Sequence, residues 1–409
     1  MKIVGLITEY NPFHNGHKYH IQQALEQTAS DAAVVVMSGD FVQRGTPSVM
    51  PKTLRVRAAL LSGASAVFEL PLIYACSSAE YFADGAVSLL HSLGCVDCIC
   101  FGGECDNIEI LRSIAAILAE EPAEYRIRLQ EYIKQGYSYP VSRKLALDAY
   151  TGSTEYGEIL DSPNNILGIE YIKAAIKLHS EIDFHVLKRI SSSYHDTDLK
   201  EQFSSATSIR AVLENRDSFP EDMLTNQIPA NCLEIMNQHF RSDYPVCVDD
   251  FSLLLHYRLL TETAETLITY ADVSMDLANR IIKNRNKFIG WNQFCDLLKT
   301  KEVTYSRISR CLLHILLDIR KTDYTDGMQK VSYARLLGFS AAQKDILSEI
   351  KKNSMIPVIS RAGDLSCLDD RAKTLYSKEI NAANIYQAVL SNKFSQPFLH
   401  EFQKKIVII

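Results

Sequence analysis

The chain has 409 residues and a formal net charge of −6, with 47% hydrophobic and 22% charged residues. These values are typical of a soluble globular protein of two or three domains, and the chain contains no internal repeat or low-complexity tract. The apolar run before Glu9 is too short for a signal peptide, and no later run approaches a membrane span. We therefore expect a cytoplasmic protein without a membrane segment. A negative net charge alone argues against a nucleic-acid partner, unless positive charge is concentrated in one region.

The first 27 residues predict a strand, a turn and a helix. Residues 3–8 are a short continuous apolar run, as in a strand buried on both faces, and residues 17–27 have a helical pattern. His14 and His17 are three residues apart, so both rings can lie on one side of the first helical turn. Gly16 lets a flat ligand approach the backbone, and the free N–H groups of a helix start favour phosphate. The alternative is a pair of histidines that cap the helix or are satisfied within a loop.

Strands and helices then alternate, which predicts an α/β fold with a doubly wound parallel sheet. The expected strands are 32–37, 66–71, 96–101 and 182–190, and the expected helices are 52–62, 77–93, several within 108–144, and one that starts at Pro163. In such sheets ligands bind beyond the carboxyl ends of the strands. That rule gathers the histidine turn, the loop 40–44 at the start of the polar stretch 40–47, and Gly102 into one crevice. Residues 204–210 start a helix with clustered hydroxyls that suit phosphate, or that only cap the helix.

Ten cysteines are present, and four of them, between Cys95 and Cys105, invite a zinc interpretation. However, residues 98–101 have the pattern of a buried strand, and no second Cys-x-x-Cys pair follows. We expect core thiols, reduced as in the cytosol, and no metal site.

The second half of the chain carries a local positive charge. Residues 215–232 contain two prolines and several acids and predict a domain boundary, after which the pattern is mainly helical. Residues 280–321 hold ten Lys or Arg and three acids, a charge of +7, and the stretch includes Trp291 between Phe288 and Phe294. A basic surface with interleaved aromatics fits RNA phosphates and bases, whereas the alternative is a solvated helical face over core aromatics. The candidate RNA contacts are Lys283, Arg285, Lys287, Arg307 and Arg310.

The predicted organisation is therefore an α/β domain with a phosphate-binding crevice (1–220), a basic helical domain (221–330) and a mixed α/β segment (331–409) with a strand candidate at 357–359.

The motifs resemble those of a known superfamily. His14-Asn15-Gly16-His17 resembles the His-x-Gly-His signature of the nucleotidyltransferase superfamily that includes class I aminoacyl-tRNA synthetases. Residues 205–210 are similar to its second signature, Ser-Ser-Thr-x-x-Arg, which secures triphosphate; Ala206 replaces the second Ser. More specifically, the runs 8–17, 38–45 and 163–168 look like those of the bacterial tRNA(Met) cytidine acetate ligase family.

That resemblance implies an enzyme that activates acetate with ATP as acetyl-adenylate and acetylates the exocyclic amine of the wobble cytidine of elongator tRNA(Met), with release of AMP and diphosphate. It also implies that residues 1–220 are the ATP-binding catalytic domain and that residues 221–330 bind tRNA. The implied ATP contacts are Ile7, Thr8, Glu9, Asn11, Pro12, Phe13, Gly16, His20, Gly102, Asn164, Asn165, Arg189, Ser205, Thr207 and Arg210. We expect His14 and His17 to donate hydrogen bonds to phosphate oxygens and Mg²⁺ to bridge others. Asp40, Gln43 and Arg44 are candidates for handling acetate or cytidine, or are simply loop structure.

Two other functions fit part of the pattern. A small-molecule nucleotidyltransferase, with adenylyl transfer to a phosphorylated acceptor, accounts for the histidine turn but leaves the C-terminal half unexplained. A non-catalytic tRNA-binding protein would bind tRNA with steep salt dependence and turn over no ATP.

Overall fold

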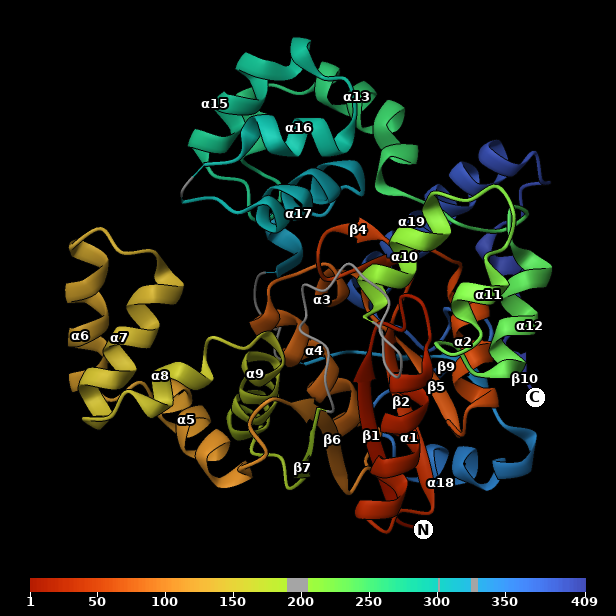
Figure 1. The fold of residues 1–409 in the computed structure, drawn as a ribbon, viewed down its shortest axis with the longest axis horizontal. Helices are drawn as coiled ribbons and strands as arrows, with labels where there is room; N and C mark the ends of the chain where they lie inside the picture. The colour runs from red at the N-terminus through yellow and green to blue at the C-terminus, as the bar shows by residue number, and fades with distance from the viewer. Residues whose placement is uncertain (190–204, 301, 325–329) are drawn as a thin grey trace.

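The computed structural model describes residues 1–189, 205–300, 302–324 and 330–409 (Figure 1). Its centre is an eight-stranded sheet with the strand order β10-β8-β5-β2-β1-β6-β7, in which β9 pairs with β8. The strands are β1 (Ile3–Thr8), β2 (Ala32–Ser38), β5 (Ala66–Leu70), β6 (Cys98–Gly103), β7 (Asp183–Lys188), β8 (Ala334–Phe339), β9 (Val358–Ile359) and β10 (Val407–Ile408). The strands from β5 to β7 in this order are all parallel, which confirms the predicted α/β fold.

The sheet is buried on both faces because alternate residues of its strands enter two different hydrophobic clusters. Val34 and Val36 of β2 face one cluster, whereas Val35 and Met37 face the other, and all four are fully buried. This two-sided burial explains the continuous apolar runs in the sequence.

Helices cover both faces of the sheet, and further helices project from one side of the molecule (Figure 1). The helices of the N-terminal half are α1 (Asn15–Gln27), α2 (Lys52–Leu61), α3 (Leu72–Ala75), α4 (Ala79–Ser92), α5 (Ile108–Glu120), α6 (Ala123–Lys134), α7 (Tyr139–Thr151), α8 (Glu155–Ile159) and α9 (Pro163–Lys177). Helices α6 and α7 form a hairpin that projects from the body of the molecule, at the left of Figure 1. The predicted helix starts at Lys52 and Pro163 are confirmed.

The remaining helices include a separate helical lobe. Helices α10 (Ala206–Glu214), α11 (Glu221–Leu224) and α12 (Ala230–His239) lead to the lobe, which consists of α13 (Ser252–Thr261), α14 (Ala264–Leu267), α15 (Met275–Asn284), α16 (Trp291–Leu298) and α17 (Tyr305–Leu316). The lobe lies above a short hairpin of β3 (Phe41–Val42) and β4 (Thr46–Pro47) (Figure 1). Trp291 and Phe294 are fully buried in it, so the RNA-contact interpretation of these two aromatics is wrong and the core alternative is correct.

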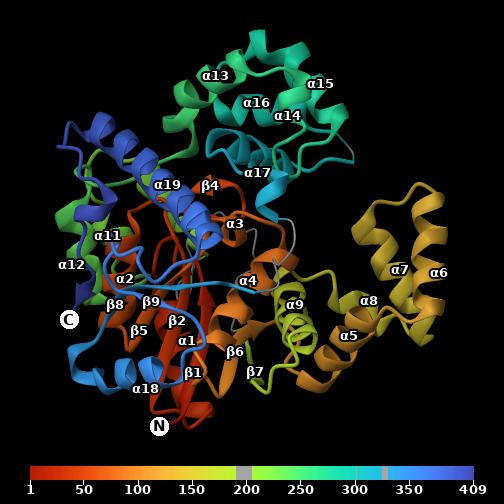
Figure 2. The ribbon, with the colours of Figure 1, turned by 180° about the vertical axis from the view of Figure 1, so that it is seen from behind.

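The C-terminal residues 331–409 return to the sheet. β8 pairs antiparallel with β5, and β9 and β10 pair parallel with β8, so the sheet is mixed and continues across the domain boundary predicted at residue 331. The strand predicted at 357–359 is β9, whereas β8 and β10 were missed. This segment also contains α18 (Asp345–Asn353) and the long α19 (Asp370–Phe394), which in Figure 2 runs between the sheet and the helical lobe.

A buried ion network attaches the C-terminal segment to the sheet. Lys52 Nζ lies 2.8 Å from Glu69 and 2.7 Å from Glu401, and Arg335 makes ion pairs of 2.8 Å and 2.6 Å with the same two carboxylates. All four side chains are almost inaccessible to solvent. Removing one member would leave an uncompensated buried charge, so the network requires the C-terminal segment to be in place.

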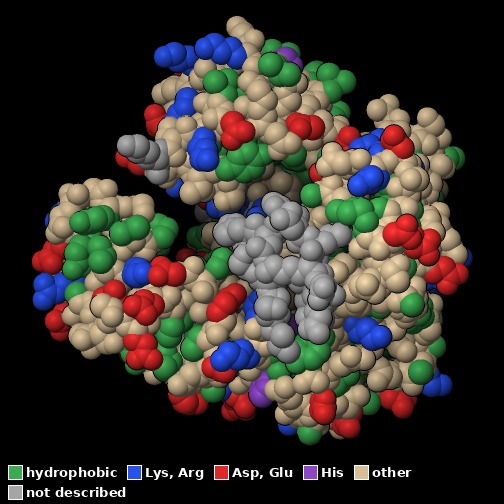
Figure 3. Space-filling view, viewed as in Figure 1, with side chains coloured by type: hydrophobic (Ala, Val, Ile, Leu, Met, Phe, Trp, Pro, Cys, Tyr) green, Lys and Arg blue, Asp and Glu red, His purple; other side chains and the backbone are tan. Residues whose placement is uncertain are grey.

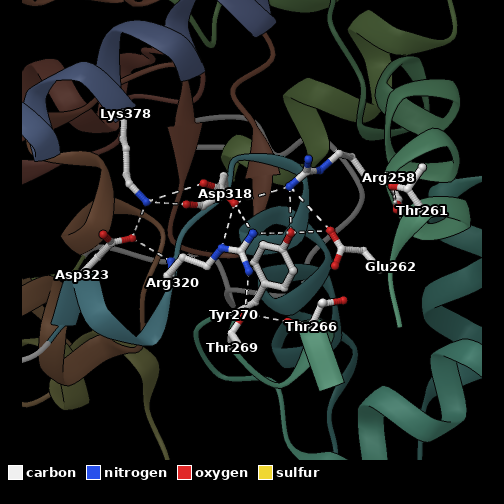
Figure 4. Close-up of polar contacts among 10 residues, drawn as sticks. All are labelled: Arg258, Thr261, Glu262, Thr266, Thr269, Tyr270, Asp318, Arg320, Asp323 and Lys378. Atoms are coloured by element: carbon white, nitrogen blue, oxygen red, sulfur yellow. Dashed lines mark hydrogen bonds and ion pairs between the residues drawn. The ribbon is translucent and has the colours of Figure 1, made fainter. Parts of the chain in front are cut away.

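A second polar cluster lies where the helical lobe meets the rest of the chain (Figure 4). The Tyr270 hydroxyl accepts hydrogen bonds from Arg258 (2.7 Å) and Arg320 (2.9 Å) and donates one to Glu262 (2.6 Å). The Arg320 guanidinium also lies over the Tyr270 ring, 3.8 Å from its centroid. One hydroxyl therefore joins α13 to the segment that follows α17.

Lys378 connects the same cluster to α19. Its Nζ donates to the backbone oxygen of Asp318 (2.6 Å) and pairs with Asp323 (2.7 Å), while Arg320 pairs with Asp318 (2.6 Å) (Figure 4). The lobe is thus held to α19 by charged side chains far apart in sequence.

Candidate active site

A cavity of about 310 Å³ opens at the carboxyl ends of β1, β6 and β7, where the strand alternation predicted it. The predicted site residues that line it are Ile7, Thr8, Glu9, Asn11, His14, Gly16, His17, His20, Gln43, Arg44, Gly102, Asn164, Arg189, Ser205, Thr207 and Arg210. These residues come from six separate stretches of the chain. The fold therefore brings most of the predicted nucleotide contacts together.

The hydrogen bonds of the two histidines at the start of α1 determine which ring nitrogen carries the proton. His14 is the N-cap, and its Nδ1 accepts from the backbone N–H of Gly16 at 3.1 Å. His17 Nδ1 accepts from the backbone N–H of His14 at 3.3 Å, and the two rings stack with centroids 3.7 Å apart. Because each Nδ1 is an acceptor, each neutral ring carries its proton on Nε2. The capping alternative is thus correct for Nδ1, and Nε2 is left as a donor.

The surroundings keep these imidazoles neutral. Burial lowers the pKa of His14 to about 3, with further lowering by the nearby Arg189 and Arg210. Burial, and then His14, hold the pKa of His17 well below its usual value, and burial lowers the pKa of His20 to about 4. At neutral pH the rings are hydrogen-bond donors without charge. A pair of N–H donors that need no desolvation of a cation suits the oxygens of a phosphate.

Two arginines supply the positive charge. Arg189 follows β7, and its backbone N–H donates to Gly103 O at 3.0 Å, which fixes the residue beside Gly102. On α10, Arg210 donates to the backbone oxygen of Asn11 at 2.5 Å and to Thr207 Oγ1 at 3.1 Å. Both guanidinium groups line the cavity, where they can pair with anionic oxygens.

Ser205 caps α10, since its hydroxyl accepts from the backbone N–H of Ser208 at 3.1 Å. The capping alternative for the hydroxyl cluster is therefore correct at this residue, which also lines the cavity. Ser204 lies outside the described residues.

Three predicted nucleotide contacts support the site from behind instead of lining it. Pro12 and Phe13 are buried under the turn, where the Phe13 ring packs against Tyr10 with centroids 4.8 Å apart. Asn165 is buried, and its Oδ1 accepts from the backbone N–H groups of Glu104 (2.9 Å) and Cys105 (3.0 Å). Its neighbour Asn164 reaches the cavity, so the sequence motif contains one lining and one supporting amide.

Asp40, predicted as a catalytic residue, is placed elsewhere. Its carboxylate is buried, accepts from the Lys52 backbone N–H at 2.8 Å and lies 3.7 Å from Lys52 Nζ. It is absent from the cavity lining. A structural role in the loop fits this position. The carboxylate belongs to the buried ion network and accepts a hydrogen bond from the first residue of α2.

The β3–β4 hairpin forms the wall of the cavity nearest the helical lobe. Val42, Gln43, Arg44 and Thr46 line the cavity. At the tip, the Gly45 carbonyl accepts from Ser309 Oγ of α17 at 2.7 Å, and Trp291 Nε1 donates to the same Ser309 hydroxyl at 3.1 Å. Gly45 has a φ of +76°, and a Cβ there would collide with the backbone of Arg310. The helical lobe therefore positions the loop that carries Gln43 and Arg44.

The predicted RNA-contact residues separate into two groups. Lys283 and Lys287 are exposed near the end of α15, and Arg285 between them donates to the backbone oxygens of Leu259 and Glu262. Arg307 is exposed on α17, and Arg310 lies 3.8 Å from Asp272 beside the hairpin tip.

Some lining residues gave no signal in the sequence. Phe82, Phe101, Leu167 and Tyr171 form an apolar and aromatic part of the wall. Each lies on a helix or strand with its own core-facing pattern, so nothing in the sequence distinguishes them from core residues.

Arg55 is a second omission. It is fully buried on α2, and its guanidinium donates to the backbone oxygens of Glu9 (2.7 Å), Ser38 (3.0 Å), Met50 (3.2 Å) and Gly39. A buried guanidinium thus ties together the ends of β1 and β2 and the start of the hairpin.

The fold and the histidine turn define a nucleotidyltransferase: the family model for HIGH Nucleotidyl Transferase matches residues 1–400. The tRNA(Met) cytidine acetate ligase of Acetivibrio thermocellus is 38% identical over 100% of both chains, and that of Clostridium kluyveri is 42% identical over 92% of this chain and 95% of its own. The chain belongs to the tRNA(Met) cytidine acetate ligase family.

Solved structures agree with this assignment. Thermotoga maritima TmcAL in its apo form superposes with a TM-score of 0.94 at 32% identity, covering 100% of this chain and 99% of that chain. The same protein bound with alpha-thio ATP has a TM-score of 0.91 at 31% identity, with complete coverage of both chains. The likeness therefore includes the helical lobe and the C-terminal segment as well as the sheet.

Proposed function

We propose that the protein activates acetate with ATP as acetyl-adenylate and then acetylates the exocyclic amine of the wobble cytidine of elongator tRNA(Met), with release of AMP and diphosphate. The observation that carries this proposal is the paired neutral imidazoles of His14 and His17 at the start of α1, in one cavity with Arg189 and Arg210. The family and the names of its members support the choice of reaction.

In the first step a carboxylate oxygen of acetate attacks the α-phosphorus of ATP, and diphosphate leaves. The protein contributes position and charge compensation, because no covalent help is needed for phosphoryl-type transfer. The Nε2–H groups of His14 and His17 donate to phosphate oxygens, Arg189 and Arg210 pair with the negative charge, and the backbone N–H groups at the start of α1 add their dipole.

Magnesium is part of the proposal as an ion that arrives with the nucleotide. The described residues contain no cluster of three or more His, Cys, Asp or Glu that could hold a metal, and the phosphate oxygens of ATP are the hard ligands that Mg²⁺ prefers.

In the second step the amine attacks the carbonyl carbon of acetyl-adenylate, and AMP leaves. The target base has to be exposed, which fits an unpaired anticodon-loop nucleotide. The cavity wall formed by the β3–β4 hairpin links the cavity to the helical lobe. Lysine and arginine side chains are visible on that lobe in Figure 3. The same view shows the surface hollowed between the lobe and the α6–α7 hairpin. These features support RNA binding on the side of the cavity that the β3–β4 hairpin forms.

We place the reaction in the cytoplasm. No helix of the described residues is long and apolar enough to cross a membrane, and all ten cysteines are free thiols.

The deciding experiment is incubation of the purified protein with ATP, Mg²⁺, labelled acetate and unmodified elongator tRNA(Met), followed by mass spectrometry of the anticodon loop. We expect one acetyl group on the wobble cytidine and one AMP for each acetyl transferred. Folded protein that forms no acetylcytidine, but adenylylates a phosphorylated small acceptor, would favour the small-molecule nucleotidyltransferase instead.

A further inference from the structure

Glu9 is the one carboxylate among the described residues that line the cavity. Around it the lining carries four cationic side chains, Arg44, Lys188, Arg189 and Arg210, besides the three histidines. A carboxylate would repel the phosphates that those groups attract. The side chain of Glu9 therefore requires a role other than phosphate binding.

The position of Glu9 is fixed from two sides. Its backbone oxygen accepts from the buried Arg55 at 2.7 Å, and its Oε1 accepts from the backbone N–H of Gln43 at 2.8 Å. Within the described part of the chain, Oε2 makes no hydrogen bond or ion pair. The carboxylate is thus held by one oxygen and presents the other as an acceptor, without cost in side-chain ordering when a ligand arrives.

The contact with Gln43 also places Glu9 on the hairpin side of the cavity. The tip of this hairpin is bonded to α17 through Gly45 and Ser309, next to the predicted RNA contact Arg310. Arg189 instead follows β7, and Arg210 lies on α10. Glu9 is therefore on the side where the RNA is proposed to enter.

We propose that Glu9 accepts a hydrogen bond from the exocyclic amine of the target cytosine and takes its proton during acetyl transfer; this rests on the function proposed above. A carboxylate is the natural partner of the cytosine amine, whereas uracil presents an oxygen at that position and is repelled. When the amine nitrogen forms its bond to the acetyl carbon, the bond from that carbon to the adenylate oxygen breaks. AMP leaves with the electron pair, and the amine proton passes to Glu9 Oε2. This assigns the side chain to the cytosine in place of the nucleotide.

Glu9→Gln tests the proposal because the amide keeps the acceptor for the Gln43 N–H but turns an N–H donor toward the cytosine amine. Acetate-dependent exchange of labelled diphosphate into ATP, without RNA, measures the first step alone. We expect exchange within about threefold of the wild type and a single-turnover acetyl transfer to an anticodon stem-loop slowed about 100-fold or more. Glu26→Gln, exposed on α1, is the matched control and should change neither rate.

A second measurement uses the wild-type protein and a stem-loop whose target base is pyrimidin-2-one, which lacks the amine. We expect it to bind about tenfold or more weakly than the cytosine stem-loop, the loss of a hydrogen bond to a charged group. Equal binding would overturn the proposal, as would normal acetyl transfer by Glu9→Gln. Loss of exchange in a Glu9→Gln variant with wild-type melting temperature would place Glu9 in the first step and also overturn it. If the wild type itself neither exchanges diphosphate nor acetylates RNA, the proposed function fails instead.

Discussion

The cavity and the joint, by which we mean the polar cluster that holds the helical lobe to α19, are formed by different kinds of interaction. The cavity contains neutral imidazoles and backbone N–H groups at the start of α1, and its two main histidines, His14 and His17, are three positions apart in sequence. The joint gathers charged side chains around Tyr270 and Lys378, which are more than one hundred residues apart in sequence (Figure 4). The candidate nucleotide site therefore depends on local backbone geometry, whereas the position of the helical lobe depends on long-range ion pairs. Mutations in the two regions should therefore separate the two half-reactions.

The largest effect on folding is expected from Lys52→Met, because it leaves three buried carboxylates, those of Asp40, Glu69 and Glu401, against Arg335, which pairs with only two of them. We expect a loss of about 3–5 kcal/mol in the free energy of unfolding, measured by urea denaturation. Lys351→Met, exposed on α18, is the control and should change stability by about 0.5 kcal/mol or less. Equal stability of the two variants would show that the ion network does not hold the C-terminal segment.

The next largest effect is on the first half-reaction. His17→Asn removes the Nε2 donor and should slow acetate-dependent diphosphate exchange about 100-fold, a loss of about 3 kcal/mol of transition-state stabilisation. His179→Asn is the control, because this exposed residue has a φ of +52° that Asn tolerates. The account of the cavity is wrong if His17→Asn exchanges diphosphate at the wild-type rate.

The free energy of unfolding should also decrease as the pH is lowered, because of the same histidines. The pKa of His14 is about 3 in the folded chain, below its ordinary value of 6.5, so between these values the unfolded chain binds a proton that the folded chain does not. Stability due to this group is therefore complete above pH 6.5 and is lost as the pH falls, by up to about 1.4 kcal/mol per pH unit.

His14→Asn should remove that contribution, so the unfolding free energy of the variant should depend less steeply on pH between 6.5 and 5 than that of the wild type. Denaturant titrations at several pH values measure the two slopes. Parallel slopes would contradict the assignment of a neutral ring at position 14.

The smallest effect is expected at the joint. Tyr270→Phe keeps the ring under Arg320 but removes the hydroxyl shared by Arg258, Arg320 and Glu262. We expect a loss of about 1–2 kcal/mol in unfolding free energy, a several-fold rise in KM for tRNA and unchanged diphosphate exchange. Tyr257→Phe, exposed on α13, provides the stability control. A fall in exchange would mean that the joint also shapes the nucleotide site.

The sequence predicted the parts of the fold that depend on short-range patterns. The strands β1, β2, β5, β6 and β7, the helix starts at Lys52 and Pro163, and the histidine turn follow from apolar runs, prolines and glycine, whereas the short β3–β4 hairpin was expected only as a polar loop. β8 was missed because its antiparallel pairing with β5 joins residues that are more than 260 positions apart. No local signal reports such a pairing.

The candidate site was predictable to the same extent. His14, His17 and Gly102 were found because strand ends converge at one edge of a parallel sheet. Asp40 was misplaced because its partner Lys52 lies at the start of a helix that the sequence locates but does not orient. Arg55 was missed because an arginine within an expected helix is normally assigned to the surface, and its backbone acceptors are set by tertiary structure.

The most direct test of the central claim is a crystal structure of this protein with a non-hydrolysable ATP analogue. The account predicts phosphate oxygens within hydrogen-bond distance of Nε2 of His14 and of His17, with both Nδ1 atoms still bonded to backbone N–H groups. Phosphates bound away from these rings, or rings whose Nε2 atoms face the protein interior, would contradict it.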